Sequence, residues 1–77
     1  LGDAVLCGLS GQVTPNGYYN IERMLAAAVR RGAEVGACGT CMEARGVHDK
    51  PLVQGVRRSS LEELTQWTLW ADHVMVF

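Results

Sequence analysis

Apolar residues recur every three or four positions between residues 21 and 31, which is the spacing of an amphipathic α-helix. The positions concerned are Ile21, Met24, Leu25, Ala28 and Val29. Asn20 is a residue type that caps helix amino ends, Glu22 suits the positive end of the helix dipole, and Gly32 suits the carboxyl end. The pattern therefore predicts a helix over residues 21–31.

A second helix carries its own start signal. Ser60 and Glu63 form a capping box, in which each side chain binds the backbone amide of the other residue. The face that follows is made of Leu61, Leu64, Trp67, Thr68 and Ala71. Trp67 and Trp70 lie three positions apart, and we expect them in the core or in a subunit interface.

The remaining segments lack helical periodicity. Residues 33–39 (AEVGACG) are apolar and small and predict a strand, followed by one or two helical turns over residues 40–45. A short strand is expected near residues 55–58, and the run His73–Phe77 (HVMVF) is expected to be a buried strand. For residues 2–10 a short helix and the end of a strand both remain open.

This order of helices and strands is that of an α/β protein with parallel strands and right-handed crossovers. With 77 residues the chain holds one domain at most. It begins at Leu1 without an initiator methionine. We therefore expect that an N-terminal element is absent or that a partner subunit completes the fold.

Composition and charge narrow the class of protein. Hydrophobic residues make up 48% of the chain and charged residues 19%, which is typical of a globular domain and not of a disordered one. The net charge is −1 and the only basic clusters are two arginine pairs, so binding of nucleic acid through a basic face is not expected. No apolar run approaches the roughly 20 residues of a membrane span, and acidic Asp3 is unlike a secretory leader.

The chain contains three cysteines, Cys7, Cys38 and Cys41. An odd number in a short chain argues against a disulfide framework and for a reducing compartment, which predicts a cytoplasmic protein. Free thiols there are core residues, metal ligands or nucleophiles. Cys7 lies in an apolar segment and is expected to be a core residue.

Cys38 is the candidate for a working residue. It ends the predicted strand, and active sites in open α/β sheets lie outside the carboxyl ends of strands. The amino end of a helix over residues 40–45 would direct unpaired N–H groups at the thiol and favour the thiolate. Cys41 completes a C-x-x-C pair, and Arg45, four residues further on, would add positive potential.

Other interpretations of the cysteines remain open at this point. C-x-x-C also occurs in redox pairs and in half of a zinc site. A zinc site needs about four ligands. Only His48 lies close enough in sequence to be a third, so no metal is expected. A thioredoxin-type pair opens a long helix, whereas the helix here would end by Gly46.

The segments around these residues resemble the DsrE/DsrF-like family. The resemblance covers Gly2 to Phe77 and is carried by residues 17–32 (GYYNIERMLAAAVRRG), 38–46 (CGTCMEARG) and 68–77 (TLWADHVMVF). It implies a flavodoxin-like three-layer fold with a parallel sheet, and assembly as trimers, hexamers or mixed complexes. In sulfur-carrying members a cysteine eight residues before a glycine accepts a persulfide, and here the matching position is Cys38.

Two departures from the family pattern affect what the resemblance implies. The family domain begins with a strand and a helix that would precede Leu1, so residues 1–77 are expected to be a single, N-terminally truncated domain. Cys41 is not part of the simplest sulfur-carrier pattern, which leaves a resolving, a disulfide-forming and a packing role open.

The hypothesis is a sulfur carrier or sulfurtransferase subunit without a cofactor, whose partners are sulfur donor and acceptor proteins. The alternatives are a non-catalytic oligomeric binding module and a C-x-x-C redox protein.

Overall fold

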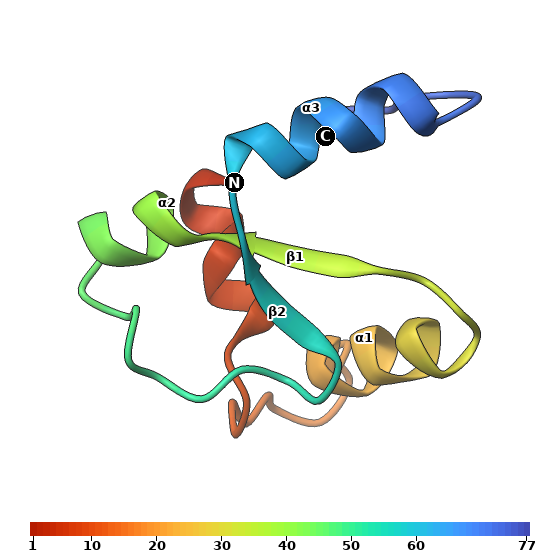
Figure 1. The fold of residues 1–77 in the computed structure, drawn as a ribbon. Coiled ribbons are helices and arrows are strands. Elements are labelled where there is room, and N and C mark those ends of the chain that lie inside the picture. Colours follow the sequence, from red (N-terminus) through yellow and green to blue (C-terminus); the bar gives the residue numbers. More distant parts are fainter.

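The computed structural model describes residues 1–77 as a small α/β arrangement around two parallel strands (Figure 1). Along the chain the elements are η1, a 3-10 helix (Gly2–Gly8), α1 (Ile21–Arg30), β1 (Val35–Cys38), α2 (Gly39–Ala44), β2 (Val56–Ser59) and α3 (Leu61–Trp70). The predictions of an α/β chain and of parallel strands are thus confirmed. Residues 2–10, for which two structures remained open, form mainly the 3-10 helix η1.

Both predicted helices begin where their caps place them. The Asn20 side chain accepts a hydrogen bond from the Arg23 amide at the start of α1, and Ser60 does the same for the Glu63 amide at the start of α3. Each bond satisfies a backbone N–H that has no partner within the helix. None of the helices has the length and apolar content that a bilayer-spanning helix requires.

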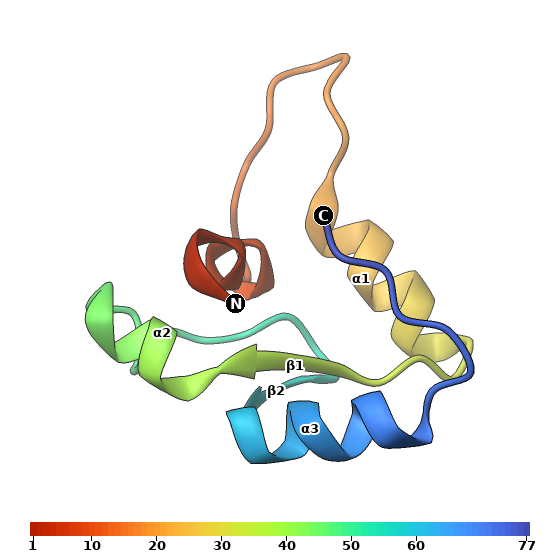
Figure 2. The same ribbon diagram turned by 90° about the horizontal axis from the view of Figure 1, so that it is seen from above.

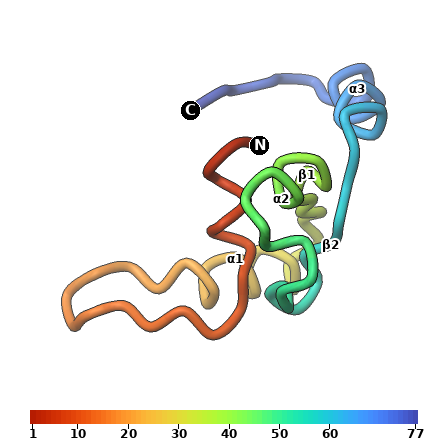
Figure 3. Tube along the Cα trace, turned by 90° about the vertical axis from the view of Figure 1, so that its left-hand side faces the viewer, coloured from red at the N-terminus to blue at the C-terminus, as the bar shows by residue number.

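The sheet has α3 on one face and η1 with α1 on the other (Figure 2). Strands β1 and β2 pair in parallel, with Val35 opposite Val56 and Cys38 opposite Ser59. Because side chains alternate along a strand, Gly36 and Cys38 share one face of β1. Figure 3 shows the sheet between α3 and the layer that η1 and α1 form.

The core lies between β1, α2 and η1. Its buried side chains are Val5, Ala37, Cys38, Met42, Val53 and Val56. Met42 of α2 is only 1% exposed, which makes α2 the element that closes this core. Val53 fixes the loop before β2, since its amide donates to the Gly8 carbonyl at 2.8 Å.

The prediction that His73–Phe77 forms a buried strand is wrong. The segment leaves the end of α3 without regular structure, and Val76 is 90% exposed. An apolar run becomes a strand only where another strand pairs with its backbone, and the sheet consists of β1 and β2 alone. The apolar residues of this segment therefore indicate side chains that other protein should cover, but they do not indicate a strand that pairs with its backbone.

Gly55 is the position in the fold where both backbone and space require glycine. Its φ is +89°, and a Cβ there would lie 2.3 Å from Cγ1 of Val29 in α1. A side chain at this position would thus strain the turn into β2 and push α1 away from the sheet.

We predict that Gly55→Ala lowers the free energy of unfolding by about 2 kcal/mol more than Gly17→Ala does. Gly17 is the matched control, because its φ is +91° but nothing lies within 4 Å of the added carbon. Urea unfolding followed by circular dichroism measures both variants. Equal losses in the two variants would contradict close contact between Gly55 and Val29.

Candidate functional site around Cys38

Cys38 lies where the chain changes from strand to helix. It is the last residue of β1 and the N-cap of α2, and its own side chain makes no capping hydrogen bond. The residue is 5% exposed, yet it borders a small cavity on the α3 side of the sheet. Cys38 is therefore buried and still borders a cavity.

Hydrogen bonds lower the pKa of the Cys38 thiol to about 7. The largest contribution comes from the hydroxyl of Thr40, whose Oγ1 lies 3.3 Å from the Cys38 sulfur. The backbone amide and then the thiol of Cys41 contribute next, while burial acts in the opposite direction. These groups favour the charged sulfur by donating to it, so the thiolate is substantially populated near neutral pH.

The cavity beside the sulfur has a volume of about 50 Å³. Its lining consists of Leu1, Gly36, Cys38, Ser59, Ser60, Leu64 and Trp67. Gly36 lets β1 and β2 approach closely here, because a Cβ at that position would lie 2.7 Å from Cβ of Ser59, whereas its distance to the Trp67 ring, 3.5 Å, would be an ordinary contact. The small residue at position 36 is thus a condition for the present shape of the cavity.

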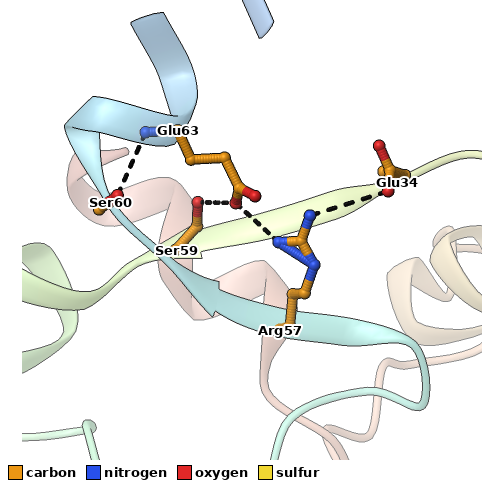
Figure 4. A network of polar contacts seen from close by, with 5 residues as sticks. All are labelled: Glu34, Arg57, Ser59, Ser60 and Glu63. Atoms are coloured by element: carbon orange, nitrogen blue, oxygen red, sulfur yellow. Dashed lines mark hydrogen bonds and ion pairs between the residues drawn. The ribbon is translucent and has the colours of Figure 1, made fainter. Parts of the chain in front are cut away.

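A polar network fastens α3 over this cavity (Figure 4). The Glu63 carboxylate accepts hydrogen bonds from the Ser59 hydroxyl and, at 2.6 Å, from Nη1 of Arg57. The Arg57 guanidinium also lies 3.8 Å from the Glu34 carboxylate and 5.3 Å from the ring centre of Trp67. Side chains of β2 and α3 therefore hold α3 against the sheet at this site.

The structure brings Cys41 to Cys38, as the C-x-x-C spacing suggests, because Cys38 is the N-cap of α2 and Cys41 lies in its first turn. Cys41 is half-buried and contacts the Cys38 thiol, and all three cysteines are free thiols. Arg45 donates from Nη1 to the Cys41 carbonyl at 3.1 Å and from Nε to the Asp3 carboxylate at 2.8 Å. Its guanidinium thus ties α2 to η1, and its charge is balanced by Asp3.

Other residues considered from the sequence lie elsewhere or have another surrounding. Cys7, expected in the core, is exposed on η1, because the 3-10 helix directs Val5 and Gly8 inward instead. His48 is exposed in the turn after α2. No three side chains of His, Cys, Asp or Glu lie close enough together to hold a metal ion.

Arg58 and Trp67 have more specific contacts than the sequence indicates. Arg58, part of one of the two arginine pairs, donates to the Glu43 carboxylate at 2.6 Å and lies across Gly39. Trp67 is half-buried against Gly36, whereas Trp70 is 81% exposed. Trp67 thus lies partly in the core, whereas for the exposed Trp70 a position in a subunit interface stays a prediction.

Thr40, Ser59 and Glu63 belong to the candidate site but were not predicted from the sequence. Thr40 is two residues from Cys38, and a hydroxyl at that distance on a helix amino end was a signal that the sequence offered. Ser59 reaches the site only through the register of β1 and β2, which the sequence does not contain. Glu63 was identified as a cap and not as the acceptor for Ser59 and Arg57.

The lowered pKa of Cys38 predicts a specific pH dependence of its reactivity. The rate of alkylation by iodoacetamide should rise with pH and reach half its maximum at about pH 7, because the thiolate is the reacting form. Exposed Cys7 serves as the internal control for the supply of reagent. Peptide mass spectrometry separates the two sites, and a midpoint of Cys38 at the free-thiol value of about 8.5 would contradict the hydrogen-bonded environment described above.

The chain is similar to known proteins over nearly its whole length. Protein YchN of Escherichia coli K12 is 44% identical over 77 residues, which is all of this chain and 65% of YchN. The uncharacterized protein MK0008 of Methanopyrus kandleri is 35% identical over 75 residues, or 97% of this chain and 61% of that protein. The chain thus spans slightly less than two thirds of the length of these relatives.

The fold has a counterpart among solved structures. The crystal structure of the ychN protein from E. coli matches with a TM-score of 0.90 and 45% sequence identity, over 99% of this chain and 64% of that one. The family model described as DsrE/DsrF-like family matches residues 1–77. Sequence and fold lead to the same conclusion: the chain belongs to the DsrE/DsrF-like family.

Proposed function

We propose that this chain is a sulfur-carrying subunit, in which Cys38 accepts a sulfane sulfur as a persulfide and passes it to an acceptor thiol. The observation that carries the proposal is the Cys38 thiol itself, which has a pKa of about 7 and borders a cavity at the end of β1. Membership of the DsrE/DsrF-like family supports a function related to sulfur relay.

Loading requires no reagent beyond the donor. The Cys38 thiolate attacks the outer sulfur of a donor persulfide, so that a new S–S bond forms at Cys38 and the S–S bond of the donor breaks. The electron pair of the broken bond remains on the donor, which leaves as a thiolate and takes up a proton. A thiol with a pKa near the ambient pH is close to the optimum for such an attack.

The cavity supports the proposal through its size. Its volume of about 50 Å³ exceeds the share of about 30 Å³ that one water molecule occupies in the liquid. One additional sulfur atom on Cys38 therefore has a place without displacement of α3. Leu64 and Trp67 contribute apolar lining around it, and Ser59 and Ser60 contribute polar lining.

Cys41 has two roles in this proposal that experiment can separate. Its amide and its thiol both favour the Cys38 thiolate, which makes it a positioning residue for loading. The contact between the two thiols also supports a second candidate function, a reversible Cys38–Cys41 disulfide. Arg45 holds the Cys41 carbonyl and so keeps the first turn of α2 in place.

Sulfur donor and acceptor proteins are the proposed partners, in a trimer, a hexamer or a mixed complex in the cytoplasm. The exposed surface supports assembly, since its area of 6127 Å² exceeds the about 4600 Å² of a compact monomer of this mass. Large apolar side chains are exposed on α3 and after it, namely Leu69, Trp70, Val74, Met75, Val76 and Phe77. Such a face is typical of a surface that other protein covers.

Intact-protein mass spectrometry after incubation with inorganic polysulfide tests the proposal. We expect the wild-type chain and Cys41→Ser to gain sulfur, and Cys38→Ser to lose at least about nine tenths of that gain, because the accepting thiolate is absent. Cys7→Ser is the matched control for an exposed thiol, and peptide mapping assigns the loaded residue.

Three results would contradict the proposal. Loading that persists in Cys38→Ser would move the accepting role to another cysteine. A wild-type chain that gains no sulfur but forms a Cys38–Cys41 disulfide, which is lost in either single variant, would favour the redox function. A folded chain that does neither would favour a non-catalytic binding module.

A further inference from the structure

Thr40 is placed so that its hydroxyl group has the Cys38 sulfur as its hydrogen-bonding partner. Oγ1 of Thr40 and Sγ of Cys38 are 3.3 Å apart, and no other hydrogen bond engages this hydroxyl group. The residue is exposed at the start of α2, while the sulfur is buried. The hydroxyl thus reaches the sulfur from the solvent side of the site.

The other threonines of the helices show why Thr40 is free for this contact. Thr65 and Thr68 of α3 donate to the carbonyl groups four residues earlier, at 3.0 and 2.8 Å. This bond is the usual one for threonine inside a helix. Thr40 is the second residue of α2, so the residue four positions earlier, Gly36, lies in β1 and offers no helical carbonyl.

When the sulfur is a thiolate it carries no proton, so the hydroxyl must be the donor. We propose that this donation from Thr40 acts in both directions of sulfur transfer, by holding Cys38 as a thiolate before loading and by stabilising it as the leaving group during release. The inference rests on the proposed function and adds a residue that acts on the reacting atom.

The release step shows where the leaving group matters. An acceptor thiolate attacks the outer sulfur of the Cys38 persulfide and forms a new S–S bond. The S–S bond at Cys38 breaks, and its electron pair remains on the Cys38 sulfur, which is again a thiolate beside Thr40. A thiol of lower pKa leaves faster, so the same hydrogen bond that favours the resting thiolate favours release.

Removal of the hydroxyl should therefore have effects of opposite sign on loading at different pH. If Thr40→Val returned the pKa of Cys38 from about 7 to the free-thiol value of about 8.5, the thiolate fraction at pH 7 would fall by roughly 15-fold. Each thiolate would gain roughly fivefold in nucleophilicity. Loading would then slow by about threefold at pH 7 and accelerate by up to about fivefold at pH 10. These values are upper bounds, because the Cys41 contacts remain.

The experiment measures loading and release separately on the folded chain. Loading by inorganic polysulfide is followed at pH 7 and pH 10, and release from the preloaded, desalted chain to 2-mercaptoethanol is followed as the loss of sulfur by intact mass. We expect Thr40→Val to load more slowly than wild type at pH 7, to load faster at pH 10, and to release at least about twofold more slowly at both pH values.

Two matched variants isolate the hydroxyl. Thr40→Ser keeps the donor and should restore wild-type rates, and Thr65→Val removes a hydroxyl that is engaged within α3 and should change neither rate. Wild-type rates in Thr40→Val at both pH values, or slower loading at both, would overturn the role of Thr40. If the wild-type chain takes up no sulfur at all, the proposed function fails first, and this inference fails with it.

Discussion

Parallel pairing of β1 with β2 determines what can surround the Cys38 sulfur. The register places Ser59 opposite Cys38 and Arg57 opposite Gly36, and both β2 residues reach Glu63 of α3. A shift of one residue would turn these side chains to the opposite face and leave Glu63 without them. The position of α3 over the sheet, and hence the cavity, depends on this register.

The site is polarised by neutral donors rather than by a free positive charge. Arg45, Arg57 and Arg58 all have carboxylate partners, at 2.8, 2.6 and 2.6 Å. The groups that lower the pKa of Cys38 are the Thr40 hydroxyl, the amide and thiol of Cys41, and the amide of Thr40. Short-range hydrogen bonds act only on the sulfur that they contact, whereas a free cation would also attract unrelated anions to the entrance.

Much of the fold could be predicted from local signals. The caps at Asn20 and Ser60 act within one helical turn, and the residues that follow them are helical as expected. The position of Cys38 between a strand and a helix could also be predicted, because the end of the strand and the start of the helix are adjacent in sequence. His73–Phe77 could not be assigned correctly, since pairing depends on a distant strand. Ser59 was missed for a related reason, because only the sheet register brings it to Cys38.

The contact between Gly36 and Ser59 has a consequence for how this protein can change in evolution. The two backbones approach so closely that a methyl group at position 36 would meet the Ser59 side chain at 2.7 Å. The side chains at positions 36 and 59 therefore share a limited volume, so that a larger residue at one position requires a smaller one at the other. An alanine at position 36 is tolerated most readily beside a glycine at position 59. Such a replacement would delete the hydroxyl that holds Glu63. A mutation of this glycine in β1 would thus be inherited together with a weaker attachment of α3 to the sheet.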